Sequence, residues 1–313
     1  MIFYFTATGN SLEAAQTIAE ATHDSLADMG SAFRQGTFGF HVEQGENLGF
    51  IFPVNTFTTP ALVDEFLRWL CFITPNGNDF VPGYCYCVIT CGVFVGNTAG
   101  FFAKMLAKYQ HIKLDASFSI RNVNNCIILT GPGSTRKQKR LNEGAHRTAR
   151  SIAFQIDSKR MVHAEDRNPL GLVLSAFTGK EHKPSSTRRF SLNRGRCSRC
   201  GICWDICPTN VIYQDEDGFP TWEADRCTRC FACLQRCPLE AIQYGTSTTR
   251  RQRYTNPILD ANPTFTAAIA QSVDMSIPEP EEIIHPINGN DEEEMPPAHE
   301  TQPAVPGQPD LPA

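Results

Sequence analysis

The chain has 313 residues, of which 41% are hydrophobic, and its formal net charge is −5. This length is sufficient for two domains. The longest apolar run, residues 169–177, is too short to cross a bilayer, and residues 1–5 lack the basic segment with which a secretory signal peptide begins. We therefore expect a protein without a membrane span, whose thirteen cysteines are kept reduced in the cytoplasm.

The first 160 residues alternate between predicted strands and predicted helices. Residues 2–5 are continuously apolar, as in a strand buried on both faces, and residues 12–19 carry apolar side chains at helical spacing. Further strands are predicted at residues 48–52, 84–90, 116–120 and 126–129, and further helices at residues 62–70, 101–109 and 135–160. This alternation indicates an α/β domain with a parallel sheet and right-handed crossovers.

A short loop rich in hydroxyl groups joins the first strand to the first helix, and it reads Thr6-Ala-Thr8-Gly9-Asn10-Ser11. Free N–H groups at a helix start, together with the helix dipole, favour an anion, and hydroxyl groups can donate further hydrogen bonds to a phosphate monoester. Serine, threonine and asparagine at a helix start also act as plain capping residues. The motif by itself is compatible with both interpretations.

In a doubly wound sheet, ligands bind beyond the carboxyl ends of the strands, where the strand order reverses. Three predicted loops follow strands in this way, at residues 6–11, 53–60 and 90–97. We expect these loops to line one crevice.

On the T-x-T-G-N-S loop and the alternation of strands with helices, residues 1–155 resemble flavodoxins. The resemblance implies a flavodoxin-like doubly wound parallel sheet over residues 1–160 and a non-covalently bound FMN. It implies that the FMN phosphate is held by Thr6, Thr8, Gly9, Asn10 and Ser11. It implies that the isoalloxazine ring is approached by Asn55, Phe57, Cys91, Gly92 and Phe94. The two phenylalanines are also compatible with a role as core or loop anchors, and Cys91 with that of a small buried residue.

An internal repeat occupies residues 197–208 and 227–238. Each copy has four cysteines with the spacing C-x2-C-x2-C-x3-C followed by proline, and the copies are offset by 30 residues. Zinc also binds CxxC pairs, but two zinc sites would not need a third cysteine and a Cys-Pro step in each copy. The pattern therefore predicts two [4Fe–4S] clusters.

This stretch resembles bacterial two-[4Fe–4S] ferredoxins, which implies a small α+β domain over residues 191–245. In such ferredoxins the fourth cysteine of each motif ligates the cluster of the other motif. By that rule the first cluster takes Cys197, Cys200, Cys203 and Cys237. The second cluster takes Cys227, Cys230, Cys233 and Cys207.

Two further segments are predicted from composition. Residues 161–190 are expected to form a linker, and residues 246–313 an acidic, proline-rich, disordered tail. Residues 254–313 hold eleven acidic residues and eleven of the 21 prolines, but no lysine or arginine, so they cannot bury a core. A solvated tail is the simple interpretation, and a docking arm that mimics a partner's charge is the alternative.

Taken together, residues 1–245 resemble the flavodoxin–ferredoxin fusion proteins of anaerobic microbes. The resemblance implies an electron-transfer protein that passes electrons between FMN, the two clusters and a redox partner protein. The alternative is a flavin enzyme that acts on a quinone, porphyrinogen or nicotinamide, with the clusters as its electron feed. We identify no acid–base residue in the three loops and assign no catalytic residue, which favours the carrier. A redox sensor with the tail as its output is a third hypothesis, and no nucleic-acid partner is expected.

Overall fold

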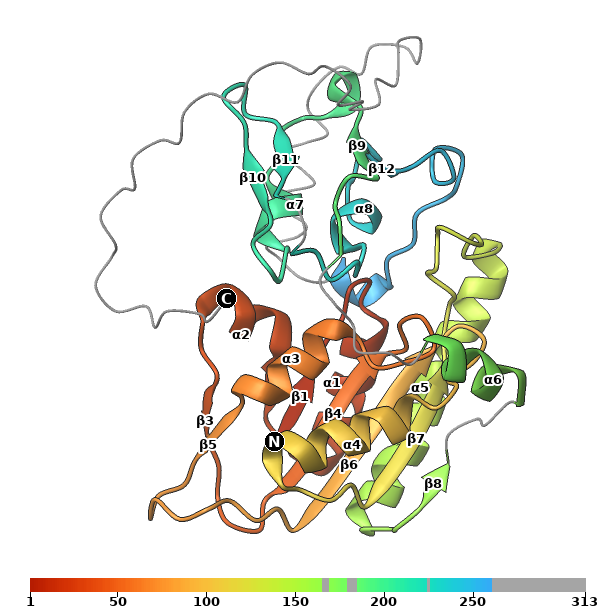
Figure 1. Cartoon of the computed structure of the whole chain (residues 1–313). Coiled ribbons are helices and arrows are strands. Elements are labelled where there is room, and N and C mark those ends of the chain that lie inside the picture. Colours follow the sequence, from red (N-terminus) through yellow and green to blue (C-terminus); the bar gives the residue numbers. More distant parts are fainter. Residues whose placement is uncertain (165–168, 179–184, 224–225, 261–313) are drawn as a thin grey trace, which may run out of the picture.

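The computed structural model describes residues 1–164, 169–178, 185–223 and 226–260 (Figure 1). We call residues 1–164 and 169–178 the sheet domain. Residues 185–223 and 226–245 are the cysteine module, and residues 246–260 are the C-terminal segment. Within these described ranges no helix is both long enough and apolar enough to cross a membrane.

Six parallel strands form the centre of the sheet domain, in the order β2-β1-β4-β6-β7-β8. Their bounds are β2 (Leu26–Asp28), β1 (Ile2–Tyr4), β4 (Asn47–Pro53), β6 (Tyr84–Cys91), β7 (Ala116–Arg121) and β8 (His163–Ala164). All eight residues of β6 are buried, as expected for a central strand with helices on both faces. The chain leaves β1 toward β2 on one side, and β4 lies on the other side, so strand order reverses at β1.

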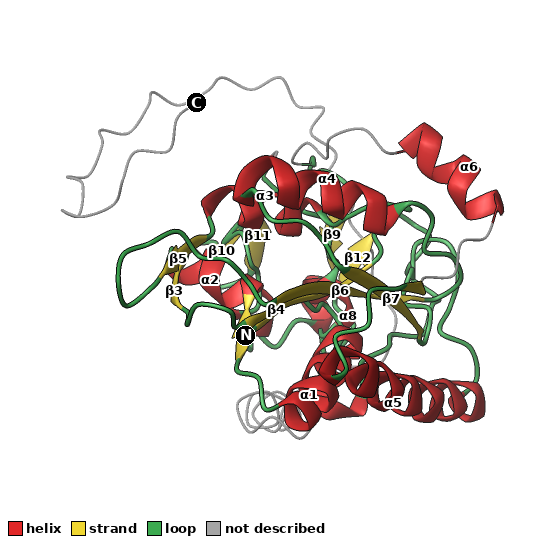
Figure 2. Ribbon diagram, turned by 90° about the horizontal axis from the view of Figure 1, so that it is seen from below, coloured by secondary structure: helices red, strands yellow, loops and turns green. Residues whose placement is uncertain are grey.

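Helices cover both faces of this sheet (Figure 2). One face is covered by α1 (Asn10–Thr22) and α5 (Thr135–Asp157), which share an apolar core with Tyr86 of the sheet. The other face is covered by α2 (Met29–Gln35), α3 (Ala61–Trp69) and α4 (Thr98–Gln110). Its core is rich in phenylalanine, and Phe50 and Phe102 meet there with ring centroids 5.0 Å apart. The predicted α/β domain with a parallel sheet is confirmed.

The segment predicted as a linker contains regular structure. Strand β8 extends the sheet beside β7, and α6 (Pro169–Thr178) lies over two of the predicted ligand loops. Ser175 of α6 donates a hydrogen bond to the carbonyl of Phe57 (2.9 Å), and its hydroxyl accepts one from the amide of Asn97 (2.9 Å). These contacts join distant parts of the chain, which is why local composition did not reveal them. Strands β3 (Gly39–His41) and β5 (Cys71–Ile73) form a separate parallel pair.

The strand predicted at residues 126–129 is wrong, because these residues form a turn. Asn124 accepts a hydrogen bond from the amide of Cys126, whose carbonyl accepts from the amides of Leu129 and Thr130. The turn places Ile127, which is 1% exposed, in the apolar core of the cysteine module. Burial in a neighbouring module therefore decides the conformation of this segment.

The cysteine module is built from short elements around one small core. Its helices are α7 (Ile202–Asp205) and α8 (Ala232–Gln235), and a 3₁₀ turn, η1, spans Arg194–Arg196. Two antiparallel strand pairs complete it, β9 (Phe190–Leu192) with β12 (Ile242–Tyr244) and β10 (Ile212–Gln214) with β11 (Pro220–Trp222). In the core the rings of Phe190 and Phe231 pack against Tyr244, with centroids 5.0 Å from it in each case.

The cysteine module lies over the carboxyl ends of the sheet strands (Figure 1). The C-terminal segment runs back along the same edge and includes a 3₁₀ turn, η2 (Pro257–Leu259). The sequence assigned this segment to the tail, yet Tyr254, Asn256 and Leu259 are all buried. The remainder of the predicted tail, residues 261–313, lies outside the described residues.

Replacing Ile127 by alanine tests how much the packing between domains contributes. We expect Ile127→Ala to lower the free energy of unfolding by about 2–5 kcal/mol, because it removes a buried side chain and leaves a cavity. Leu129→Ala in the same turn is the control, since Leu129 is 71% exposed and its loss should change the stability by less than about 0.5 kcal/mol. Urea unfolding under anaerobic conditions measures both. Equal effects of the two substitutions would contradict the packing described here.

Candidate metal centre

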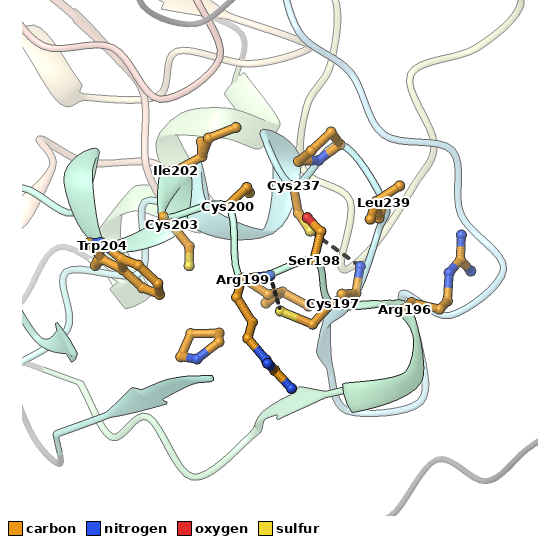
Figure 3. Close-up of a pocket in the computed structure, with 15 residues that line it drawn as sticks. Arg196, Cys197, Ser198, Arg199, Cys200, Ile202, Cys203, Trp204, Cys237 and Leu239 are labelled. Carbon is orange, nitrogen blue, oxygen red and sulfur yellow. Dashed lines mark hydrogen bonds between the residues drawn. The ribbon is translucent and has the colours of Figure 1, made fainter. Parts of the chain in front are cut away.

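Four cysteines from both repeats line one pocket of the cysteine module (Figure 3). Cys197, Cys200 and Cys203 come from the first repeat, and Cys237 comes from the second. Backbone amides point at two of the sulfurs, because Arg199 N–H donates to Cys197 Sγ (3.4 Å) and Ala241 N–H donates to Cys237 Sγ (3.2 Å). The pocket therefore collects the four residues that the spacing rule assigned to the first cluster.

The second repeat builds an equivalent group. The amide of Arg229 donates to Cys227 Sγ (3.3 Å), as that of Arg199 does to Cys197 in the first repeat. Both arginines have left-handed backbone conformations, with φ of 50° and 59°, which turn the chain tightly around the sulfurs. Burial raises the pKa of Cys227, Cys230 and Cys233, and the nearby Cys207 of the first repeat adds to each shift.

When no metal is bound, burial disfavours the charged thiolate form of these cysteines. It raises the pKa of Cys203 and of Cys227 to about 12 each, and the neighbouring cysteines add to both shifts. Burial also raises the pKa of Cys233 well above its ordinary value. Thiolates are the form that binds metal, so the positive charge of the bound iron must offset this cost and protons are released on binding.

A cubane and a single zinc ion need different arrangements of their cysteine ligands. Across the described ranges, no three His, Cys, Asp or Glu side chains converge closely enough to hold one metal ion. A zinc site needs four ligands about 2.0–2.3 Å from one centre. In a cubane each cysteine binds a different iron, so the sulfurs surround the cluster without meeting at a point. Two groups of four cysteines, the first of which lines one pocket, supply the eight ligands that two cubanes need.

These features define an iron–sulfur protein with a two-cluster module. Residues 184–242 match the family of 4Fe-4S dicluster domains, and the chain belongs to this family. The prediction of a two-[4Fe–4S] ferredoxin domain is thereby confirmed.

Curated relatives share this part of the chain. Pyruvate synthase subunit PorD of Pyrococcus furiosus is 35% identical over 71 residues, which are 21% of this chain and 68% of the relative. Ketoisovalerate oxidoreductase subunits VorD of Pyrococcus horikoshii and Pyrococcus abyssi are each 39% identical over 58 residues, which are 18% of this chain and 50% of each relative. The chain thus spans half the length of the VorD subunits, and the similarity covers only a minor part of the chain itself.

The predicted phosphate loop lies where expected, at the carboxyl end of β1 and the start of α1. Gly9 precedes the helix in a left-handed conformation (φ 93°), which glycine tolerates best. The hydroxyl groups of the loop already have partners within the chain. Thr6 Oγ1 accepts from the amide of Gly9 (3.0 Å), Thr8 Oγ1 accepts from the side chain of Asn125 (2.7 Å), and Ser11 Oγ lies 2.8 Å from Thr90 Oγ1.

The residues predicted near a flavin ring lie in two loops that α6 brings together. Asn55 exchanges two backbone hydrogen bonds with Thr58 (3.0 Å each), so Phe57 sits at the tip of a tight turn. Cys91 is the last residue of β6 and is buried. A Cβ on Gly92 would lie 2.6 Å from Asn124 Cβ, and one on Gly171 would lie 3.2 Å from Phe94 Cβ. The three predicted loops therefore meet at one edge, but their role toward a flavin stays a prediction.

Sequence reasoning missed the residues that join the cysteine module to the sheet domain. Arg236 Nε donates to the carbonyl of Ala7 (2.6 Å), and Gln235 Nε2 donates to the carbonyl of Asn125 (2.8 Å). Cys230 packs against the phenylalanine-rich core of the sheet domain. The sequence did contain a signal for Arg236, because the two copies of the repeat differ there. The corresponding residue of the first copy is Ile206.

Arg236 places a cation beside the second group of cysteines. Burial lowers the pKa of Arg236, and the neighbouring Cys230 and Asp28 oppose that shift. Arg199, by contrast, is exposed, and its guanidinium lies over the ring of Phe219 at 4.3 Å from the centroid. A charge that is withdrawn from water acts more strongly on its neighbours than a solvated one.

We therefore expect Arg236→Leu to lower the reduction potential of the second cluster, because a nearby positive charge stabilises the more negative, reduced cluster. Arg236→Lys keeps the charge and should restore most of the potential. Arg199→Leu is the control and should have a smaller effect, since its guanidinium is exposed to solvent. An anaerobic titration followed by electron paramagnetic resonance measures each midpoint. A shift in Arg199→Leu that equals or exceeds that in Arg236→Leu would contradict this assignment.

Proposed function

We propose that the protein transfers electrons through two [4Fe–4S] clusters to a redox partner protein. The observation that carries the proposal is that cysteines from both repeats gather in the cysteine module, Cys237 with the first three cysteines of the first repeat and Cys207 near those of the second. The first set is Cys197, Cys200, Cys203 and Cys237. The second set is Cys227, Cys230, Cys233 and Cys207.

The relatives suggest the kind of partner. Their names describe subunits of a pyruvate synthase and of ketoisovalerate oxidoreductases, so we propose that the partner is an oxidoreductase of this kind. The first set of cysteines is the side that such a partner would meet. Arg196 and Arg199 next to it are exposed, whereas Cys230 of the second set faces the sheet domain.

The sheet domain is proposed to be flavodoxin-like. The separate pair β3 and β5 does not belong to the main sheet. When the strands of the main sheet are renumbered along the chain, the first five have the order 2-1-3-4-5, which is the order of flavodoxin-like sheets. The loop at residues 6–11 lies at the point where strand order reverses. The cysteine module covers the same edge, so a ligand in this loop would lie beside the second set of cysteines.

FMN is the ligand that this proposal implies, and it would supply chemistry that links one-electron and two-electron steps. Thr6, Thr8, Gly9, Asn10 and Ser11 have the side chains and the backbone position to hold its phosphate. Asn55, Phe57, Cys91, Gly92 and Phe94 lie on the two loops nearest to where the ring would be. The flavin enzyme remains the second candidate, which the convergence of these three loops supports.

The proposed exchange of the fourth cysteine between the repeats can be tested directly. Cys207→Ala lies in the first repeat but should damage the second cluster, and Cys237→Ala should damage the first cluster. Iron and sulfide analysis, together with electron paramagnetic resonance of the anaerobically purified protein, distinguishes the two. Cys126→Ala, which lies outside both repeats, is the control and should retain both clusters. Loss of the first cluster in Cys207→Ala would overturn the ligand assignment.

The relay itself is tested by kinetics. With a donor that reduces the clusters but not free flavin, reduction of FMN in the loaded protein should proceed at a rate independent of protein concentration, because both carriers belong to one chain. Cys207→Ala should slow this phase. Stopped-flow flavin absorbance at several protein concentrations measures it. A rate proportional to concentration would show that the two domains work separately.

A further inference from the structure

Residues 254–259, which we call the clasp, lie directly on the loop at residues 6–11. The backbone amide of Asn256 donates to the carbonyl of Thr8 (2.7 Å). Its side-chain amide donates to Glu13 Oε2 (2.6 Å) and to Asn10 Oδ1 (3.3 Å). The hydroxyl of Tyr254 lies 2.9 Å from Asn10 Oδ1 and 3.0 Å from Asn142 Oδ1. Asn256 is 2% exposed and Tyr254 is 4% exposed, so both side chains are withdrawn from solvent.

The apolar part of the clasp covers the glycine of the loop. A Cβ on Gly9 would lie 2.9 Å from both Asn256 Cβ and Leu259 Cγ, and 3.3 Å from Ile258 Cγ2. Leu259 is itself 4% exposed. The clasp therefore occupies the space next to Gly9, through which a phosphate would approach the start of α1.

The electrostatics of this place suit an amide better than a phosphate. Glu13 stands in the first turn of α1, and its carboxylate is the acceptor for the side chain of Asn256. Hydrogen bonds between an amide donor and a carboxylate are strong, whereas a phosphate beside the same carboxylate would be repelled. The side chain of Asn10 is also engaged, since Nδ2 donates to the carbonyl of Val123 (3.2 Å) while Oδ1 faces the clasp.

The clasp also touches the cysteine module. The amide of Tyr254 donates to Gln235 Oε1 (3.1 Å), and the other end of that side chain donates to Asn125 of the sheet domain (2.8 Å). Gln235 lies between Cys233 and Cys237 in the second repeat. The side chain of Gln235 thus links the clasp to Asn125 of the sheet domain, and the side chain of Asn125 in turn donates to Thr8 of the loop.

We propose that residues 254–259 are the resident occupant of the loop at residues 6–11, and that a phosphate-bearing ligand such as FMN binds there only when the clasp is released. The second part rests on the proposed flavin function. Because both occupants use the same groups, each must weaken the binding of the other by the same factor. The contact through Gln235 then couples the occupant of the loop to the second repeat, in which Cys233 and Cys237 flank Gln235.

The first experiment tests the occupant without any flavin. Asn256→Asp keeps the shape of the side chain and its hydrogen bond from the amide of Ile258, but it puts a carboxylate against Glu13. In the full-length, cluster-loaded protein, hydrogen exchange of residues 6–12 and 254–260 should become about tenfold faster or more, because a hydrogen bond to a charged group is lost. Glu13→Gln in the same chain should reverse the effect. Unchanged exchange of residues 6–12 in Asn256→Asp would overturn the clasp.

The second experiment adds FMN, with riboflavin, which lacks the phosphate, as the control ligand. Asn256→Ala introduces no charge, and we expect it to bind FMN about tenfold more tightly than the wild type does, with riboflavin affinity little changed. Flavin fluorescence measures both affinities. FMN should also speed the exchange of residues 254–260 in the wild type. Equal FMN affinities of the two proteins would overturn the competition. If exchange responds but neither protein binds FMN, the clasp stands and the flavin function is overturned.

Discussion

The fourth cysteine of each repeat lies with the first three cysteines of the other repeat, and the cysteine module depends on this exchange. Four of its buried core residues, Cys203, Cys207, Cys227 and Cys233, are cysteines of the repeats. A module of this size buries too little apolar surface to fold stably without a metal or another cross-link. In the proposed assignment each cluster takes cysteines from both repeats, so neither repeat would form its site alone. Folding of the module and assembly of the clusters would then be coupled.

Docking on the sheet domain breaks the symmetry of the repeat. The second repeat carries Gln235 and Arg236, which bond to loops at the carboxyl edge of the sheet, whereas the first repeat has Asp205 and Ile206 at the same positions. The sheet domain contributes Ile127, which packs in the core of the cysteine module. This asymmetry gives the two cysteine sets different surroundings. Both sets border an exposed arginine, Arg199 or Arg229, but only the second also borders the half-buried Arg236 and the phenylalanine-rich core.

The loop at residues 6–11 shows that a motif alone does not identify a ligand, because neighbouring residues can bind the same polar groups. Hydroxyl and amide side chains donate to a phosphate, but they serve equally well as partners for a peptide. In this chain they bond to Asn125, Thr90 and the residues of the clasp. The start of α1 keeps the backbone geometry of an anion site while Glu13 and the clasp change its electrostatics. The motif thus indicates a binding place, and its neighbours decide the ligand.

The sequence by itself determined the features that depend on local spacing. Continuous apolar runs indicated the central strands, apolar side chains at helical spacing indicated helices between them, and the cysteine spacing identified the two-cluster module. Only the tertiary structure decided the segments whose conformation depends on distant partners. Residues 126–129 turn because Ile127 is buried in another module, α6 is held by Phe57 and Asn97, and residues 254–259 are held by Thr8, Asn10 and Glu13. These segments are too short to show a hydrophobic period in the sequence. Their conformations are stabilised by contacts between positions far apart in the chain.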